Sequence, residues 1–264
     1  MQGNLPMINE AKTKMQGIAD AVKAATVAIV LHHSDMPEKN NRPFTVIGSG
    51  FCIHSQGIIV TCKHVLDGFI DPDNRQPHVM FYHPKIPGRS ELYLHIVPAI
   101  EAINNLKLPE LEGVFDLAVL KIAPPSEGYK GGYPVLSTAD YDDLYEMMDA
   151  ATCGFPLGNY SPDELATLTS SFTKSMISSI IPWPGVAQDK LLGFQLDLRV
   201  VQGNSGGPVF SLISGKVFGV LKGGIEWEGI QFLARAEPVY PTLAQGLVES
   251  LLQGTPSPTP SKAS

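Results

Sequence analysis

The stretch Gly203-Asn204-Ser205-Gly206-Gly207-Pro208 decides which kind of fold this chain adopts. It places a serine in a glycine-rich turn, where the backbone can take positive φ angles and approach a bound group closely. Such a turn exposes a hydroxyl nucleophile beside free backbone N–H groups. Because Gly/Ser turns are common, the stretch becomes informative only when partner residues are found elsewhere in the chain.

Two upstream segments supply those partners, residues 61–65 with His64 and residues 115–122 with Asp116. The order His, Asp, Ser is one of the known orders of a nucleophile–base–orienter triad. A serine hydroxyl is a poor nucleophile until a neighbouring base removes its proton, which an imidazole can do. We therefore predict Ser205 as nucleophile, His64 as general base and acid, and Asp116 as orienting carboxylate. The backbone N–H groups of Gly203 and Ser205 are the predicted oxyanion hole.

Length and composition favour a globular, strand-rich protein. A chain of 264 residues can form one large or two small domains, and its 25 Gly and 22 Pro indicate many short strands and turns. The net charge of −7 argues against a nucleic-acid partner, and no apolar run reaches the roughly 18–20 residues of a membrane span. The histidines outside the triad lack metal-ligand spacing, so we expect neither a metal nor another cofactor.

Strand-like runs fall into two groups, separated by an acidic bridge at residues 139–147. The first group is expected at 24–31, 44–53, 57–61, 78–82, 92–97 and 117–122. The second is expected at 150–154, 167–181, 191–201, 209–212, 216–221 and 230–236, with Gly223-Gly224 and Glu226-Trp227-Glu228 in a hairpin tip. Two such halves suit a pair of six-stranded barrels, at about 24–138 and 148–238. We also expect an N-terminal helical segment at 1–23, a C-terminal helix at about 241–253 and a disordered tail at 254–264.

The three cysteines, Cys52, Cys62 and Cys153, have no disulfide-scaffold spacing. We predict buried free thiols, with a Cys52–Cys62 bridge between neighbouring strands as the alternative. The first thirty residues also lack the basic start and apolar core of a secretory signal. Together these features predict a cytoplasmic protein.

At the three triad positions the chain resembles the chymotrypsin-like serine peptidases, and most closely the bacterial HtrA/Deg branch. The resemblance is carried by residues 48–51, 58–65, 116–122 and 154–158, and it extends over about 24–236. It implies an all-β fold, a chymotrypsin-like double six-stranded β-barrel with a C-terminal helix and the active site between the barrels. Only 28 residues follow Ala236, so we expect no PDZ domain.

The same resemblance suggests where substrate specificity lies. The residue six positions before the nucleophile sits at the base of the primary pocket in this family, and here it is Arg199. Together with Lys222, Arg199 would favour an acidic side chain before the cleaved bond. Alternatively, Arg199 pairs with Asp197, since the two residues share one face of a strand.

The predicted function is a trypsin-like serine endopeptidase that hydrolyses protein or peptide substrates through an acyl-enzyme. One alternative is a catalytically silent barrel that only binds peptides, although no triad group is missing. Another is a latent protease that a partner protein switches on, with the N-terminal helix as a docking or autoinhibitory segment.

Overall fold

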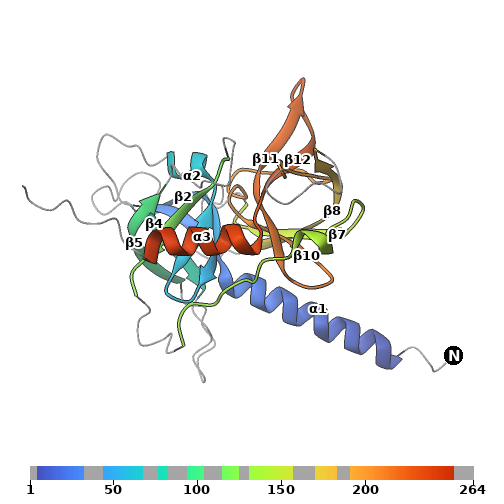
Figure 1. Cartoon of the computed structure of the whole chain (residues 1–264), viewed down its shortest axis with the longest axis horizontal. Helices are drawn as coiled ribbons and strands as arrows, with labels where there is room; N and C mark the ends of the chain where they lie inside the picture. The colour runs from blue at the N-terminus through green and yellow to red at the C-terminus, as the bar shows by residue number, and fades with distance from the viewer. Residues whose placement is uncertain are drawn as a thin grey trace, which may run out of the picture.

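The computed structural model describes eight stretches of the chain, residues 5–32, 44–67, 77–82, 94–103, 115–124, 131–156, 170–182 and 191–252. Within them, twelve strands form two closed antiparallel barrels that lie side by side (Figure 1). The predicted all-β double barrel is therefore confirmed. Closure leaves neither sheet with an edge strand, so every strand pairs with a neighbour on each side along at least part of its length.

The first barrel has the strand order β1-β2-β3-β6-β5-β4. Its strands are β1 (Thr26–His32), β2 (Phe44–His54), β3 (Ile58–Thr61), β4 (Pro77–Tyr82), β5 (Leu94–Ile103) and β6 (Ala118–Ile122). β3 and β6 are almost entirely buried, and β-branched and leucine side chains from them fill the barrel. β5 continues beyond the predicted end at residue 97, because Pro98 faces His78 in the pairing with β4 and the strand then runs on beside β6.

The second barrel has the order β10-β11-β12-β9-β8-β7. Its strands are β7 (Asp149–Gly154), β8 (Ser171–Ile181), β9 (Gly193–Leu196), β10 (Pro208–Ser211), β11 (Val217–Trp227) and β12 (Ile230–Pro238). Its core contains the ring pair Phe194 and Phe218, whose centroids lie 5.0 Å apart in an edge-to-face arrangement.

The expected hairpin tip over residues 223–228 is wrong for Gly223 and Gly224 and right for Glu228. Both glycines lie within β11, opposite Arg235 and Ala234 of β12, and the turn comes later, at Glu228 and Gly229. These two residues have φ angles of 51° and 78°, so they supply the left-handed conformation that a tight turn requires. The hairpin projects from the barrel, as Figure 1 shows.

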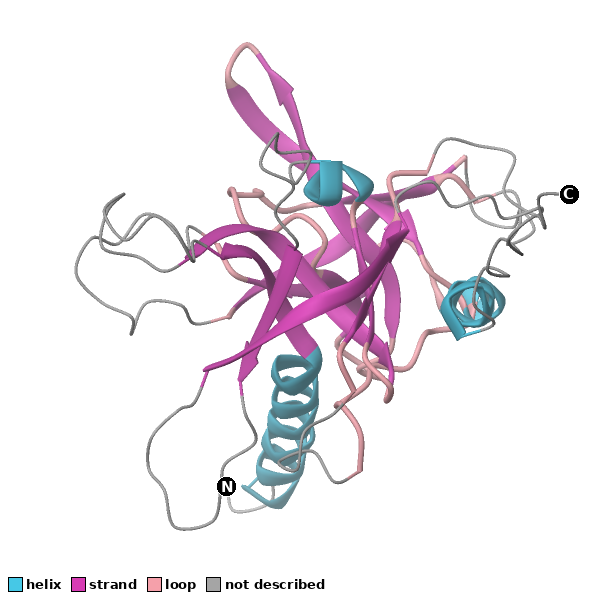
Figure 2. Ribbon diagram, turned by 90° about the vertical axis from the view of Figure 1, so that its left-hand side faces the viewer, coloured by secondary structure: helices cyan, strands magenta, loops and turns pink. Residues whose placement is uncertain are grey.

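Helix α1 (Leu5–Ala25) stands away from the barrels and joins them only at its C-terminal end (Figure 2). Val22 and Ala25 are buried there, whereas residues 10–17 are exposed. The helix continues past the predicted end at 23, and the Thr26 hydroxyl donates to the Val22 carbonyl oxygen at 2.7 Å where β1 begins. No helix in the described ranges is long and apolar enough to cross a membrane.

Helix α3 (Pro241–Leu252) closes the described chain and packs against the first barrel. Leu243, Leu247 and Leu251 form its buried stripe and join the same apolar cluster as the interior of that barrel. The predicted tail at 254–264 lies outside the described residues.

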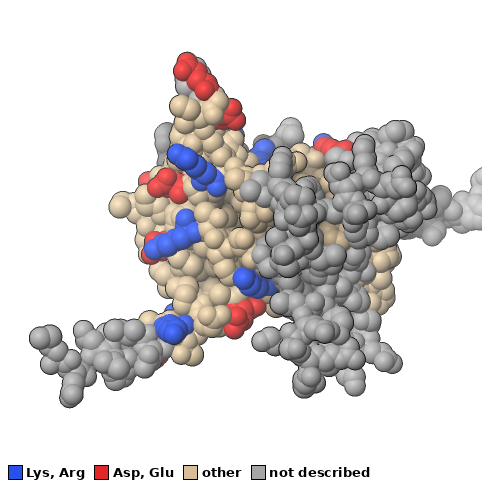
Figure 3. All heavy atoms as spheres, turned by 180° about the vertical axis from the view of Figure 1, so that it is seen from behind, with Lys and Arg blue, Asp and Glu red and all other residues tan. Residues whose placement is uncertain are grey.

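Charged side chains are unevenly placed on the face shown in Figure 3. Carboxylates gather at the outer end of the β11–β12 hairpin, where Glu226 and Glu228 are exposed. Lysine and arginine side chains are dispersed over the described part of that face.

Candidate active site

Strands β3 and β6 bring His64 and Asp116 together, because they pair antiparallel with Thr61 opposite Ala118. The chain leaves β3 and enters the short helix α2 (Lys63–Asp67), of which His64 is the second residue. Asp116 lies two residues before β6, and its carbonyl oxygen accepts a hydrogen bond from the Lys63 N–H at 3.2 Å. The pairing of β3 with β6 thus brings His64 and Asp116 into contact, although they are 52 positions apart in the sequence.

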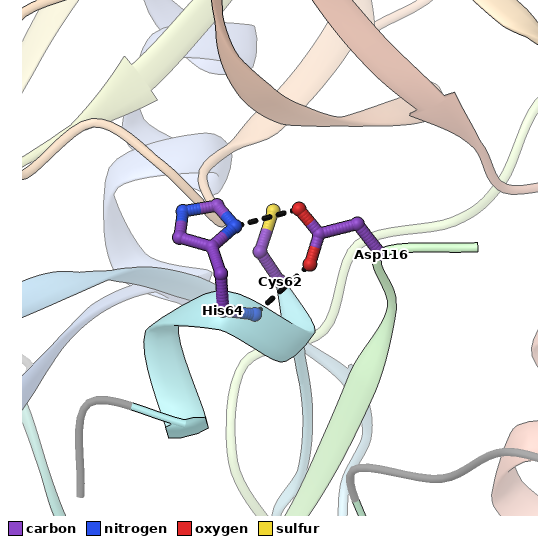
Figure 4. A group of neighbouring side chains, drawn as sticks. All are labelled: Cys62, His64 and Asp116. Carbon is purple, nitrogen blue, oxygen red and sulfur yellow. Dashed lines mark hydrogen bonds and ion pairs between the residues drawn. The ribbon is translucent and has the colours of Figure 1, made fainter. Parts of the chain in front are cut away.

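The Asp116 carboxylate holds His64 at two points (Figure 4). One carboxylate oxygen lies 2.6 Å from the ring Nδ1, and the other accepts a hydrogen bond from the His64 backbone N–H at 2.9 Å. The Asp116 side chain is only 13% exposed, whereas that of His64 is 48% exposed. The imidazole is therefore oriented from its buried side, while part of the ring stays accessible to a substrate.

Two opposing influences act on the pKa of Asp116. Burial raises it, but the hydrogen bonds from the His64 ring and backbone, together with the charges of His64 and Lys222, lower it further. The net result is a pKa below the ordinary value of an aspartate. Asp116 is consequently ionised at neutral pH, as a group that stabilises an imidazolium must be.

The turn that carries Ser205 precedes β10 in the second barrel and is bonded to β2 of the first. The Ser49 N–H donates to the Ser205 carbonyl oxygen at 2.7 Å, and the Ser49 hydroxyl donates to the Gly203 carbonyl oxygen at 2.6 Å. Within the described part of the chain, the N–H groups of Gly203 and Ser205 have no hydrogen-bond acceptor. These carbonyl groups, together with the Gly206 N–H, which donates to the Leu221 carbonyl oxygen at 2.7 Å, hold the turn and leave the other two N–H groups without an acceptor among the described residues.

Gly206 permits the close approach of this turn to the first barrel. Its φ is +89°, and a Cβ atom there would overlap the Ser49 carbonyl oxygen and the Thr61 hydroxyl. Both conditions require glycine at this position. The Gly-rich sequence around Ser205 is therefore explained by packing between the barrels as well as by backbone conformation.

The Ser205 hydroxyl donates to the backbone carbonyl oxygen of Lys222 at 2.9 Å. Within the described residues no hydrogen bond joins Ser205 to His64. The structure thus brings His64 and Asp116 into direct contact, while the serine hydroxyl has a different partner in this conformation.

Lys222 connects the two halves of the site. Its ammonium group donates to Glu237 at 2.8 Å and lies 3.9 Å from the Asp116 oxygen that contacts the His64 ring. Glu237 is 5% exposed, whereas the Lys222 side chain is 36% exposed, so a partly exposed cation lies between two carboxylates. The side chain that was expected near the substrate is therefore paired with carboxylates behind the imidazole.

Cys62 lies beside the His64–Asp116 pair (Figure 4), and the potential metal-ligating atoms of these three residues lie within 4.8 Å of one another. Burial, followed by the nearby charges of Asp116 and Glu237, raises the pKa of the Cys62 thiol well above its ordinary value. The thiol donates to the Leu221 carbonyl oxygen, and the ring Nδ1 is already bonded to Asp116. The thiol proton and the ring Nδ1 are thus both engaged within the protein, so binding a metal through them would require breaking both hydrogen bonds and deprotonating the thiol.

All three cysteines are free and buried, which confirms the prediction of unpaired thiols. Their pKa values are raised chiefly by burial, to about 12 for Cys52 and about 11 for Cys153.

Arg199 and Asp197 are both exposed, and no ion pair joins them in the part of the chain that is described. The backbone next to Arg199 is instead fixed from β12, because the Val200 N–H donates to the Gln231 side chain at 3.0 Å.

Sequence reasoning missed Ser49 and Glu237. Ser49 is fully buried, and besides its bonds to the turn that carries Ser205 its hydroxyl accepts a hydrogen bond from the Phe155 N–H at 3.0 Å. One feature of the sequence could have identified Glu237, because it is a lone carboxylate directly after the predicted strand at 230–236. A carboxylate at such a position requires a cationic partner, and Lys222, just after another buried run, is that partner.

Comparisons with known proteins agree with this geometry. No curated protein matches the chain. Among solved structures, the HtrA-type protease AlgW with tripeptide has a similar fold, with a TM-score of 0.58 and 18% sequence identity. The match covers 90% of this chain and 64% of that protein, so this chain spans less than two thirds of its length. Residues 48–220, which include His64, Asp116 and Ser205, match the trypsin-like peptidase domain. This protein therefore belongs to the trypsin-like peptidase family.

Proposed function

We propose that this protein is a serine endopeptidase in which Ser205 attacks the peptide carbonyl, His64 transfers the proton and Asp116 orients the imidazole. The observation that carries the proposal is the double attachment of His64 to Asp116, at 2.6 Å through the ring and 2.9 Å through the backbone. This attachment places the ring proton on Nδ1 and leaves Nε2 as the base. A protein or peptide with an accessible, extended segment is the corresponding substrate.

The reaction proceeds in two halves. Ser205 Oγ bonds to the carbonyl carbon while its proton passes to His64 Nε2, and the imidazolium then protonates the departing amine. A water molecule next attacks the acyl-enzyme, gives one proton to His64 and releases the acid, and Ser205 recovers its proton. Asp116 remains ionised throughout, because its role is to stabilise the imidazolium.

The N–H groups of Gly203 and Ser205 are the proposed oxyanion donors. Both lack acceptors among the described residues, and the carbonyl groups of the same two residues are anchored to Ser49. Donors that are fixed before the reaction stabilise the negative charge of the tetrahedral intermediate without reorganisation. Each such donor contributes about 3–4 kcal/mol in comparable enzymes.

The hydrogen bond from Ser205 to the Lys222 carbonyl oxygen favours a resting conformation in which the hydroxyl is bonded to the backbone and not to its base. One neutral hydrogen bond contributes about 1 kcal/mol, so rotation toward His64 reduces the rate by less than about tenfold. This bond alone therefore does not make the enzyme latent. Activation by a partner protein and a cytoplasmic location remain predictions, as does recognition of an acidic residue by Arg199.

The test is labelling with a fluorophosphonate probe, which reacts with an activated serine without requiring knowledge of the substrate. We expect the unaltered protein to be labelled, and Ser205→Ala and His64→Ala to lose labelling while retaining the wild-type circular dichroism spectrum. Labelling that persists in Ser205→Ala would assign the nucleophile elsewhere. A folded wild-type protein that is not labelled would favour the peptide-binding alternative, for which tight binding of peptides without cleavage is the corresponding positive result.

A further inference from the structure

The Lys222 side chain lies between two carboxylates, one of which is Asp116. Its ammonium group is 2.8 Å from Glu237 and 3.9 Å from the Asp116 oxygen that contacts His64. That same oxygen is 2.6 Å from the ring Nδ1. The ammonium nitrogen is therefore at most 6.5 Å from the ring nitrogen, since both distances are measured to one atom.

We propose that Lys222 and Glu237 form a positioning pair that sets the pH at which His64 becomes competent as a base. Neither side chain touches the reacting atoms, and both side chains act through Asp116, although the Lys222 backbone carbonyl accepts the hydrogen bond of the Ser205 hydroxyl. This role rests on the proposed function of His64 and Ser205, which it extends with a second layer of charge control.

The charges that face His64 come from several elements. Asp116 precedes β6, Lys222 lies on β11 and Glu237 on β12, while Cys62, which precedes α2, is held neutral by its raised pKa. The Ser205 hydroxyl is neutral and bonded to the Lys222 backbone. Two carboxylates and one ammonium therefore leave a net charge of −1 behind the ring, the same as a single aspartate would provide.

The consequence is that the two members of the pair oppose each other. Lys222 disfavours the imidazolium, because a cation lies close behind it. Glu237 favours the imidazolium by offsetting that cation, and it also holds the ammonium in place at 2.8 Å. Removing Lys222 must then shift the pH midpoint of His64 protonation in one direction, and removing Glu237 must shift that midpoint in the opposite direction.

The experiment compares Lys222→Met, Glu237→Gln and the double variant by two readouts. The first is the pH profile of kcat/KM for a peptide substrate, or of the fluorophosphonate labelling rate. The second is the pH titration of the His64 ring carbon–proton resonance by NMR, assigned by comparison with His64→Ala. The NMR readout does not depend on catalysis.

Lys222→Met leaves two carboxylates facing the ring, so the acid limb moves to higher pH. Glu237→Gln leaves the ammonium uncompensated beside Asp116, so the limb moves to lower pH. A unit charge at most 6.5 Å from the ring nitrogen, discounted because the ring and the lysine are partly exposed, corresponds to a shift of about one pH unit for Lys222→Met, and Glu237→Gln shifts the limb in the opposite direction. The pH midpoint of the double variant returns to within a few tenths of a pH unit of the wild-type midpoint.

Two further variants separate charge from packing. Lys222→Arg retains the cation and keeps the wild-type midpoint. Lys174→Met removes a lysine of the same size from an exposed ion pair with Asp149 and leaves the midpoint unchanged. If Lys222→Met does not fold, the proposal is tested with Glu237→Gln and the double variant. The pH midpoint of Glu237→Gln must lie below that of the wild type, and the midpoint of the double variant must return to the wild-type value.

Variants that lose activity but share the wild-type midpoint would overturn the proposal and reduce the pair to a structural contact. Shifts of both single variants in the same direction would overturn it equally. If the wild type neither cleaves peptide nor reacts with the probe, the proposed function fails, while the pattern of NMR midpoints still decides the role of the pair.

Discussion

Replacing Gly206 by alanine tests the close approach between the nucleophile turn and the first barrel. The φ of +89° costs an alanine about 1–2 kcal/mol. The added methyl group would overlap the Ser49 carbonyl oxygen and the Thr61 hydroxyl, so that the two chains must separate. Separation breaks the hydrogen bonds from Thr61 to the Ser49 carbonyl and from the Ser49 N–H to the Ser205 carbonyl, both of 2.7 Å.

Each of these buried hydrogen bonds contributes about 1 kcal/mol. Together with the backbone strain, we expect the free energy of unfolding to fall by about 3–4 kcal/mol. For a protein of this size that corresponds to a decrease of about 10 °C in Tm. Because native proteins have about 5–15 kcal/mol of stability, the variant still folds, but the turn that carries Ser205 is displaced.

The assay is equilibrium urea unfolding followed by fluorescence, combined with the rate of fluorophosphonate labelling. The matched control is Gly131→Ala, where no atom lies within 4 Å of the added methyl group and the backbone is unstrained. We expect this control to change stability by less than about 0.5 kcal/mol. A loss below about 1 kcal/mol in Gly206→Ala, with labelling at the wild-type rate, would refute the reasoning.

Two other properties follow from the same geometry. Asp116→Asn should lower kcat for a peptide substrate about 10⁴-fold with little change in KM, because an amide stabilises the wrong tautomer of the His64 ring. A decrease in kcat of less than tenfold would contradict the orienting role of Asp116. The folded-state pKa of Asp116 is lowered, so its stabilisation is present above the ordinary carboxyl pKa of about 3.9 and is lost as the pH falls below it. The difference in unfolding free energy between wild type and Asp116→Asn should therefore be larger at pH 6 than at pH 3. The buried thiols have raised pKa values, so they should not react with a disulfide reagent at pH 8 in the native protein. In denaturant all 3 cysteines should react. Rapid reaction of the folded protein would contradict this expectation, because it would show that a thiol is accessible.

Most of the fold was predictable because barrel strands leave local signatures. Short β-branched runs between Gly, Pro and Asn clusters identified all the described strands, since alternation and turn chemistry act over a few residues. Strand ends were less predictable. β11 passes through Gly223 and Gly224, which read locally as a turn, because pairing with β12 stabilises the strand there. Helix α1 likewise runs two residues further than predicted, up to the point where β1 enters the barrel.

The sequence by itself determined the double barrel and the identities of the triad candidates, since both are expressed in segments of five to ten residues. The tertiary structure alone decided how the side chains pair. Lys222 bonds Glu237 and faces Asp116, the Ser205 hydroxyl bonds the Lys222 carbonyl, and Ser49 joins the two barrels. These contacts link residues 15 to 154 positions apart. No local pattern encodes them, because they arise only when barrel closure brings distant strand ends to one place.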